Sequence, residues 1–577
     1  MYGVFGKILT IDCSGKTSEP EEIDESLYKT FLGGKGLGSY LLLKKNPAGI
    51  DPLSPENHLF ILTGPACGFG IWGANRYVVI TKSPLTGIFS ESYSGGKAFL
   101  QIARSGFDGI DIFGALDSWH YLEIRGGSVY FRDAADLIGK DSFETEEILT
   151  EKYKEDKPAV LTIGPAGEHL VRYAYINNDH GRSAGRTGTG AVLGSKKIKA
   201  LVIIGEISKK ARDEDILSQY KKDLLASGRD HPSTKVYNSY GTSLVVDLTT
   251  SVDAFPARYW QKGNIDHAQK INAKALHSQC SVKAKACYYC FIACTRNTAI
   301  TSGRHSGLHL DGPEYETINA FGGLNLVDDI REIAYLNDLC DRLGIDTITA
   351  GNTTAFAVEA YKAGKTDFPI DYGEVDRIAE LIRLIARREG IGDLLAEGSR
   401  KAAEVLGLSD IAVHVKGLEP PGYDPRYLQG MGLGYAISDR GACHLRSTFY
   451  KPELAGLIDP QDNTGKAEML LEYEDRITIY DTLILCRFFR DIIYWDGLNT
   501  ILRGTMGIDL SEADLRERSA KIAQNIREFN LREGMTRDDD WLPKRFFTTP
   551  VGEKGWILEE KKFRELVDDY YRLRGFD

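Results

Sequence analysis

Three cysteines stand close together near the middle of the chain, in the run Cys287-Tyr-Tyr-Cys290-Phe-Ile-Ala-Cys294. Their CxxCxxxC spacing brings three thiolates within reach of one metal centre. A tetrahedral metal ion or an iron–sulfur cubane needs four ligands, so a fourth must come from a distant part of the chain. Cys486, at the end of an apolar run, is a candidate, although a buried inert thiol is the more common role of such a cysteine.

Two glutamates, Glu314 and Glu316, follow this array in the run Asp311-Gly-Pro-Glu-Tyr-Glu316. Carboxylates near a redox centre could move protons, so the pair indicates a cluster beside an acid–base group. A structural zinc knuckle has similar cysteine spacing, so it remains an alternative interpretation of the array. Radical-SAM enzymes usually show the reverse order, CxxxCxxC, which disfavours that interpretation.

Composition narrows the class of protein. The 577 residues are enough for about two to four domains. The net charge of −11 and the lack of a long basic stripe disfavour binding to nucleic acid. No apolar run reaches the length of about eighteen residues that a membrane span needs, and the N-terminus lacks the features of a signal peptide. The nine cysteines are an odd number, and the six outside the array are scattered, so they do not form a disulfide framework. We therefore expect a cytoplasmic protein that does not bind membranes.

The first part of the chain, residues 1–207, is predicted to be rich in strands. Its β-branched and apolar runs are bounded by Gly, Pro or Ser. They are His58–Gly64, Arg76–Thr81, Gly109–Phe113, Ala159–Ile163 and Ala200–Ile204. Several are too apolar to have one face in water, so we expect both faces of the sheet to be covered.

Helical periods dominate the rest of the chain. Val327–Leu343 and Glu374–Glu389 carry apolar residues at intervals of three and four, and Gly390 is a plausible helix C-cap. Ser511–Asp514 resembles a capping box that opens a further helix running toward Glu528. Breaks near Ile207 and Gly417–Pro421 predict an α+β protein: a β-rich N-terminal domain (1–207) and two mainly α-helical domains (208–417 and 418–577).

Three loops combine glycine with arginine or serine. They are Ala74-Asn-Arg76, Tyr93-Ser-Gly95-Gly96 and Gly181–Gly190, and the third contains Arg182, Ser183, Gly185 and Arg186. Glycine lets backbone N–H groups approach an oxyanion, and arginine offers two parallel donors to phosphate. The third loop contains neither a Walker A sequence nor a clean GxGxxG after a strand, and each loop alone is more often a set of tight turns. Together they favour a large phosphorylated cofactor.

Two later segments could take part in chemistry. Asp341 and Asp346 flank a glycine turn, where solvated acids at a helix end are the alternative. His444 lies between Arg440 and Arg446, whose charges would lower its pKa and favour neutral imidazole. A lone histidine is also often structural.

The chain resembles the tungsten-containing aldehyde ferredoxin oxidoreductase family over nearly its whole length. The resemblance rests on long motifs in the right order. In the first half they are Asp51-Pro-Leu-Ser-Pro-Glu-Asn57, Thr81-Lys-Ser-Pro-Leu-Thr-Gly87, Ile163-Gly-Pro-Ala-Gly-Glu168 and Ala191-Val-Leu-Gly-Ser-Lys196. In the second half they are Gly312-Pro-Glu-Tyr-Glu316, Tyr423-Asp-Pro-Arg426, Gly432-Leu-Gly-Tyr435 and Leu542-Pro-Lys-Arg545.

The resemblance implies a three-domain subunit in which a β domain forms the base for a bis-molybdopterin tungsten cofactor. Cys287, Cys290, Cys294 and Cys486 match the four ligands of a [4Fe–4S] cluster. The matches to pterin and phosphate contacts are Arg76, Gly95, Arg182, Gly185 and Arg186 in the first domain, and Asp341, Ile345, Asp346, Asp481 and Leu485 in the other two. Glu316 and His444 match the catalytic pair, and Arg440 lies in the same motif as His444.

The chain departs from the family pattern at several positions. Tyr93 stands where the family has an asparagine ligand to a Mg²⁺ ion that bridges the pterin phosphates, and Ser183 replaces an alanine that binds the same ion. Ile484 replaces the glycine of a DxxGLC motif, and Arg446 replaces a lysine near the pterin. Tyr335 and Asp338 stand where some members carry a metal site between subunits, so we expect that site to be absent.

The implied reaction is oxidation of an aldehyde, with water, to a carboxylic acid. Glu316 would take the proton from water, and His444 would polarise the aldehyde oxygen. Electrons would leave through the cluster to ferredoxin or a small iron–sulfur subunit, in a homo- or hetero-oligomer. Two alternatives remain: a tungsten subunit of a larger low-potential complex, such as an aromatic acyl-CoA reductase, and a non-enzymatic scaffold stabilised by zinc.

Overall fold

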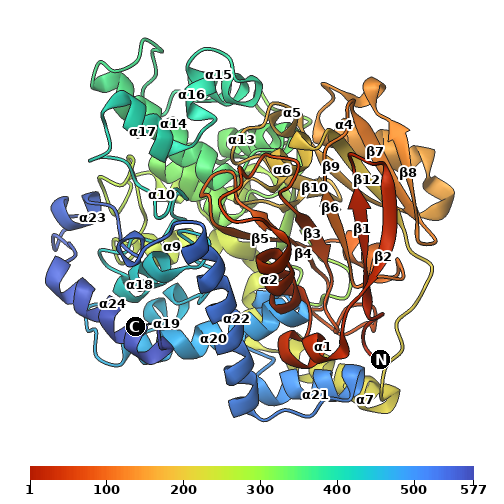
Figure 1. Cartoon of the computed structure of the whole chain (residues 1–577). Helices are drawn as coiled ribbons and strands as arrows, with labels where there is room; N and C mark the ends of the chain where they lie inside the picture. Colours follow the sequence, from red (N-terminus) through yellow and green to blue (C-terminus); the bar gives the residue numbers. More distant parts are fainter. Residues whose placement is uncertain (577) are drawn as a thin grey trace. The chain divides into compact units, whose positions relative to one another are not determined.

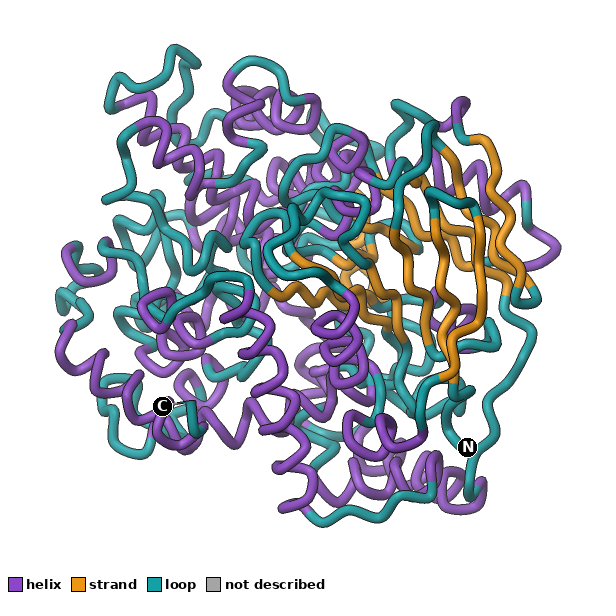
Figure 2. The backbone as a smooth tube through the Cα atoms, in the orientation of Figure 1, coloured by secondary structure: helices purple, strands orange, loops and turns teal. Residues whose placement is uncertain are grey.

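The computed structural model describes residues 1–576, which divide into two compact units. The first consists of Met1–Val236, Ala286–Ala293 and Asp475–Met535. The second consists of Tyr237–Lys285, Cys294–Glu474 and the described residues from Thr536 onward. The prediction of a β-rich N-terminal domain followed by helical domains is confirmed (Figures 1 and 2). The three-domain division stays a prediction.

The first unit contains two six-stranded sheets. One has the order β2-β1-β6-β3-β4-β5, and the other has the order β11-β10-β9-β12-β7-β8. The strands of the first sheet are β1 (Lys7–Asp12), β2 (Thr17–Glu22), β3 (Leu59–Leu62), β4 (Tyr77–Lys82), β5 (Phe89–Ser94) and β6 (Gly109–Phe113). Those of the second are β7 (His120–Arg125), β8 (Ser128–Asp133), β9 (Ala159–Ile163), β10 (Ile176–Asn178), β11 (Arg182–Ala184) and β12 (Ile198–Ile204).

Burial explains why these strands form. Every residue of β3, β4 and β12 is buried, as expected for apolar runs covered on both faces. Helix α2 (Gly34–Lys45) packs on β4 and against α22 (Glu512–Arg532). A Cβ at Gly38 of α2 would lie 2.4 Å from the Ile80 side chain, so glycine allows this close approach of helix and sheet. One hydrophobic cluster includes residues of both sheets.

The first unit contains further helices. They are α1 (Glu25–Phe31), α3 (Ala98–Ala103), α4 (Ser142–Lys152), α5 (Pro165–Glu168), α6 (Thr189–Ser195), α7 (Glu214–Arg229) and α21 (Trp495–Met506). Helices α3 and α4 both pack on β9. Two of the boundaries between the units fall inside helices, one in α8 (Pro232–Tyr240) and one in α20 (Lys466–Leu483).

The second unit is mainly helical. Its helices include α9 (Val245–Thr250), α10 (Ala268–Ile271), α11 (Ala273–Gln279), α12 (Tyr315–Ile318), α13 (Ile330–Leu343), α14 (Thr347–Lys362), α15 (Val375–Arg387), α16 (Ile391–Leu395), α17 (Ser399–Leu406), α18 (Gln429–Ile437), α19 (Tyr450–Leu454), α23 (Arg545–Thr548) and α24 (Glu560–Arg574). A three-stranded sheet has the order β13-β14-β15, formed by Ser281–Lys285, Thr295–Ala299 and His309–Asp311.

Helix ends differ from the sequence expectations in detail. Helix α15 ends on Arg388, which adopts a left-handed conformation at φ +53°, so the prediction of Gly390 as C-cap is wrong. The capping box at Ser511 is confirmed, and α22 continues to Arg532. No helix among residues 1–576 is long and apolar enough to span a membrane.

A buried ion pair holds irregular backbone in the second unit. Asp424 and Arg426 have no exposed side-chain surface, and Arg426 Nη2 lies 2.6 Å from Asp424 Oδ2. The same guanidinium donates to the carbonyls of Thr549 (2.9 Å) and Trp260 (2.8 Å). One side chain therefore connects three segments that are far apart in the sequence.

Replacing Arg426 with Met should destabilise the second unit, because Asp424 is left as a buried charge without its partner. The loss should be about 3–5 kcal/mol, measured as a lower temperature of thermal unfolding. The control is Lys544→Met, which breaks the exposed ion pair with Asp410 and should cost less than about 1 kcal/mol. Equal unfolding temperatures for the two variants would contradict this account.

Candidate active site

The first two cysteines of the array and Cys486 lie in the first unit, and one glycine connects their segments. The Gly73 N–H donates to the carbonyl of Tyr289, between Cys287 and Cys290, at 3.0 Å. The Gly73 carbonyl accepts the N–H of Cys486 at 2.8 Å. Backbone hydrogen bonds thus hold together two cysteine segments that are far apart in the sequence.

Only glycine suits this position. Gly73 has φ +88°, and a Cβ there would lie 2.8 Å from the ring of Phe489. That ring packs edge-on against Phe291 of the cysteine loop, with centroids 4.9 Å apart. Gly95 is similarly constrained, since a Cβ there would lie 3.0 Å from Cys287 Sγ.

The thiols of this group influence one another. Burial, together with the negative charge of the nearby Cys486 and Cys287 thiolates, raises the pKa of Cys290 to about 12. Arg76 Nη2 lies 3.3 Å from Cys486 Sγ and can stabilise that thiolate. Three thiolates at this spacing repel one another, so a bound cation or cluster is needed to hold them all deprotonated.

Soft thiolate donors suit zinc or an iron–sulfur cluster. Among residues 1–576, no three His, Cys, Asp or Glu side chains converge on a point that could hold a single ion. The thiolates of a [4Fe–4S] cubane bind different iron atoms, so they need not converge in that way. Cys294 is the first residue of its segment in the second unit, and its place beside the other three stays a prediction.

The three glycine-rich loops meet around Asn178 in β10. Its Oδ1 accepts hydrogen bonds from Tyr77 Oη (2.8 Å) and Ser94 Oγ (2.6 Å), and its Nδ2 donates to the Gly95 carbonyl (3.1 Å). In the sheet, Asn178 pairs with Arg182 of β11. These contacts bring together the residue after Arg76, the loop after β5 and the arginine loop. Sequence reasoning missed Asn178; its only signal was an Asn pair just before the third loop.

The arginine loop runs beside β5. Arg186 N–H donates to Ser92 Oγ at 3.1 Å, and Ser183 pairs with Asn177 in the sheet. A Cβ at Gly185 would lie 3.0 Å from Ser183 Oγ, so the chain is closely packed at this turn. The predicted phosphate-binding residues therefore come from neighbouring strands of one unit.

Tyr93 is part of a buried charged group. Its hydroxyl donates to Glu91 Oε2 at 2.5 Å, and the guanidinium of Arg487 lies 4.6 Å from its ring centroid. Arg487 also forms an ion pair with Asp481. This arrangement connects Tyr93, a departure from the family pattern, to Asp481, a predicted pterin contact. Leu485 N–H donates to the Tyr480 carbonyl at 2.8 Å, which closes the turn after α20.

The predicted acid–base pair lies within the second unit. His444 Nε2 is 3.5 Å from Glu316 Oε1, and the two side chains are 12% and 17% exposed. Glu316 is in the short helix α12, and its Oε2 accepts the Gly422 N–H at 2.8 Å. The structure therefore brings the two predicted catalytic residues together and fixes one carboxylate oxygen.

Tyrosines line this pair. The rings of Tyr423 and Tyr450 stack with centroids 4.1 Å apart, and Tyr423 lies 5.6 Å from the His444 ring. Tyr315 packs on Tyr423, and its hydroxyl donates to the Gly422 carbonyl. Burial raises the pKa of Tyr315 and of Tyr423 well above 10, so both stay neutral. Phe449, next to Tyr450 in the sequence, packs on Tyr473.

Asp341 and Asp346 are buried, at 8% and 4% exposure, so the alternative of solvated acids at a helix end is wrong. Asn337 Nδ2 donates to Asp341 Oδ2 at 2.7 Å, and Asp346 caps α14 through Ile348 N–H. Ile345, between them, is fully buried.

The arginines on either side of His444 are also buried. Arg440 and Arg446 are each 3% exposed. Arg440 Nη2 lies 3.0 Å from Cys443 Sγ, next to His444 in the sequence.

The residues at the position of the expected missing metal site make other contacts. The ring of Tyr335 stacks on His305 with centroids 4.1 Å apart, and its hydroxyl accepts from Arg383 at 2.7 Å. Asp338 accepts from Arg342 at 2.8 Å. The absence of a metal here stays a prediction.

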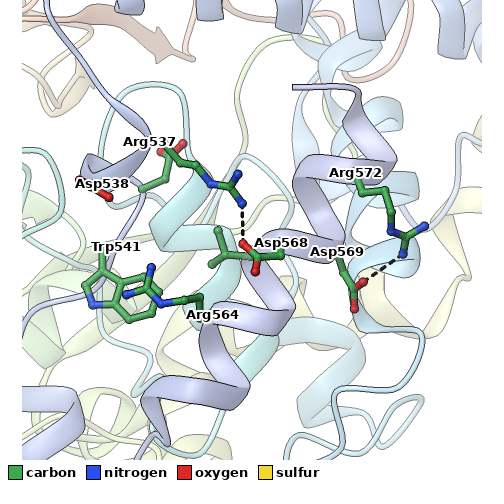
Figure 3. A pocket seen from close by; sticks show the side chains of 9 residues that line it. Arg537, Asp538, Trp541, Arg564, Asp568, Asp569 and Arg572 are labelled. Atoms are coloured by element: carbon green, nitrogen blue, oxygen red, sulfur yellow. Dashed lines mark hydrogen bonds and ion pairs between the residues drawn. The ribbon is translucent and has the colours of Figure 1, made fainter. Parts of the chain in front are cut away.

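A separate cavity of about 690 Å³ in the second unit contains none of the predicted site residues (Figure 3). Arg537 and Arg572 form ion pairs there with Asp568 and Asp569, and Arg564 lies over Trp541. Its charges are largely matched within the wall, so we assign it no role in the reaction.

Comparison with known proteins identifies the family. Residues 8–205 match the model of the aldehyde ferredoxin oxidoreductase N-terminal domain, and residues 219–577 match that of domains 2 and 3. The chain is 36% identical to the tungsten-containing aldehyde ferredoxin oxidoreductases of Pyrococcus furiosus and Thermococcus kodakarensis, over 100% of this chain and 97% of each relative.

A solved structure confirms the fold. It is the active site complex BamBC of benzoyl coenzyme A reductase with 1,5-dienoyl-CoA, at a TM-score of 0.84 and 22% identity, covering 100% of this chain and 95% of that chain. At this identity the likeness concerns the fold alone. On the family models and the identity to the two curated relatives, this chain belongs to the aldehyde ferredoxin oxidoreductase family of oxidoreductases.

Proposed function

We propose that this protein oxidises aldehydes to carboxylic acids, using a bis-molybdopterin tungsten cofactor and one [4Fe–4S] cluster. The observation that carries the proposal is the partly buried Glu316–His444 pair, at 3.5 Å, in a chain of this family. Each turnover converts RCHO and H₂O to RCOOH with release of two protons and two electrons. The electrons pass to ferredoxin or to a small iron–sulfur subunit.

The residues present fit these groups. Cys287, Cys290 and Cys486 supply soft thiolate donors, and Cys294 would complete the set of four. Gly95 leaves room next to Cys287 Sγ that a Cβ would fill. Arg76, Arg182 and Arg186 would hold the phosphates, and Asp341, Asp346 and Asp481 would accept hydrogen bonds from the pterin amino groups, beside Ile345 and Leu485.

We include in the proposal a magnesium ion between the pterin phosphates. Its ligands would differ from those of the family, because Tyr93 stands in place of an asparagine ligand. The Tyr93 hydroxyl already donates to Glu91. A Mg²⁺ ion would therefore depend on Ser183 and on backbone carbonyls, which are the hard oxygen ligands that this ion accepts.

When bound, the tungsten accepts the two electrons that leave the aldehyde. Glu316 acts as the base that takes a proton from water, and the Gly422 N–H holds one of its oxygens so that the other faces the reaction. His444 Nε2 would hold the aldehyde oxygen. The Tyr423–Tyr450 stack supplies an apolar wall that excludes water and would hold the hydrocarbon part of the aldehyde.

Replacing Glu316 with Gln should lower aldehyde oxidation by about 10²–10⁴-fold, because the amide cannot take the proton. Tungsten and iron content should not change, since Glu316 holds neither group. The matched control is Glu397→Gln. It removes a carboxylate of the second unit that pairs with Arg388 rather than with His444, and this variant should oxidise aldehydes at the parent rate. Retained activity in Glu316→Gln would refute the role assigned to this residue.

Elemental analysis of protein purified without oxygen, from a host that makes the cofactor, tests the whole proposal. We expect about one tungsten and about four iron atoms per chain, and acid formation in an aldehyde screen with a viologen dye. Zinc alone would overturn the function and support the scaffold alternative. Copurification of further iron–sulfur or flavin subunits, with no aldehyde oxidation, would favour an acyl-CoA reductase.

Replacing Gly73 with Ala should lower the iron content, because the added Cβ would collide with Phe489 and push apart the Tyr289 and Cys486 backbones. Gly87→Ala is the matched control. Gly87 also has a positive φ, of +78°, but has no atom within 4 Å of the added Cβ. It separates the cost of backbone strain, about 1 kcal/mol, from the effect of the collision. Equal iron content in both variants would show that the Gly73 junction does not position the cluster ligands.

A further inference from the structure

We propose that Asn75 is a positioning residue for the cofactor, whose side-chain amide hydrogen-bonds to the edge of a pterin ring. This inference rests on the proposed function, because it needs a bound pterin. It adds a residue to the set that the family resemblance implied, in which only the neighbouring Arg76 was assigned.

The first observation is that the Asn75 amide is buried and unsatisfied. The residue is 1% exposed, and neither Oδ1 nor Nδ2 has a hydrogen-bond partner among residues 1–576. Native proteins satisfy nearly all buried polar side-chain atoms, because an unpaired donor or acceptor is costly in a dry interior. An amide that lacks partners at both ends indicates a ligand that the chain itself does not supply.

Other buried asparagines of the first unit provide a comparison. Asn178 is bonded at both ends of its amide, to Tyr77, Ser94 and Gly95. Asn57 is likewise bonded at both ends, to Asn46 and the Pro52 carbonyl among others. Asn177 lacks a partner at Oδ1 but donates through Nδ2 to Ser142 Oγ. Asn75 differs from these three asparagines because both ends of its amide lack a partner.

The second observation is the position of Asn75 between two groups that contact the cysteines. Two residues before it, Gly73 binds the backbones of Tyr289 and Cys486. One residue after it, Arg76 donates to Cys486 Sγ. The backbone around Asn75 is thus fixed on both sides, and its amide lies in the segment that joins the cysteine loops to the start of β4.

The chemistry of the amide selects the pterin among the groups proposed to bind here. Thiolates, sulfides and phosphates only accept hydrogen bonds, so they could satisfy Nδ2 but not Oδ1. A pterin ring carries N–H donors beside N and O acceptors, and can satisfy both atoms of the amide at once. An ordered water could also do so, and the experiment must distinguish the two.

The test compares Asn75→Leu and Asn75→Asp with the parent protein, all purified without oxygen from a cofactor-making host. Tungsten and iron are measured by elemental analysis, and pterin by the fluorescence of its oxidised form after release. We expect tungsten and pterin per chain to fall by about ten-fold or more in Asn75→Leu, with iron unchanged. Asn75→Asp has nearly the same shape and shows whether the loss follows from the missing N–H donor rather than from misfolding.

The matched control is Asn525→Leu in α22. Asn525 also has a buried Nδ2 without a partner, but it lies on a helix that carries no predicted site residue. It should keep its tungsten, pterin and iron. Thermal unfolding of each metal-free protein shows that the variants fold, and Asn75→Leu should unfold at a temperature no lower than the parent, since it removes an unsatisfied amide.

Two results would overturn the proposal. Full loading of tungsten and pterin in both Asn75 variants would mean that a water satisfies the amide, and loss of iron with tungsten retained would place the contact at the cluster. A parent protein without tungsten would instead refute the proposed function on which this inference rests, so the two failures are distinguishable.

Discussion

The geometry of the candidate cluster site depends on the two hydrogen bonds made by the Gly73 peptide groups. They join the Cys287–Cys290 loop to the segment of Cys486 through backbone alone, at 3.0 and 2.8 Å. Backbone contacts fix the Cα positions of the cysteines more firmly than side-chain contacts would, because no rotamer can release them. The positive φ of Gly73 and the Phe489 ring then explain why a residue without a side chain occupies this junction.

The Gly73 junction also brings the negative charges of the cysteine thiolates close together. Buried thiolates close to one another are unstable alone, and Arg76 places a cation at one of them while the chain as a whole carries −11. Other buried charges of the same unit are paired within it, as in Lys35–Glu91 and Arg487–Asp481. A buried pair left intact needs no external partner, whereas breaking one exposes a full desolvation cost. At the cysteine site the positive charge comes from Arg76, whose guanidinium lies beside Cys486 Sγ.

The sequence allowed some of this to be predicted and not the rest. Strands β3, β4, β6, β9 and β12 were predictable because continuous apolar runs are buried on both faces. The end of α15 was not, because Arg388 rather than glycine takes the left-handed cap. Asn178 and Tyr423 acquire their roles only when distant segments meet, as β10 pairs with β11 and as α12 approaches the loop before α18. No local pattern marks such contacts. Local sequence made Glu316 and His444 candidates for chemistry, but their pairing as catalytic residues came from the family resemblance.

The departure at Ile484 shows how the chain tolerates a change at a turn where the family has glycine. Ile484 adopts φ +63°, which costs a β-branched residue about 1–2 kcal/mol. Its side chain is fully buried in the core of the first unit, and burial of an aliphatic side chain of this size contributes about 1.5–3 kcal/mol. A Cβ at Gly34 would lie 2.7 Å from Ile484 Cδ1, so the glycine that opens α2 provides the space. Burial thus offsets the strain of the positive φ, so an isoleucine can stand in the turn that carries Asp481, Leu485 and Cys486.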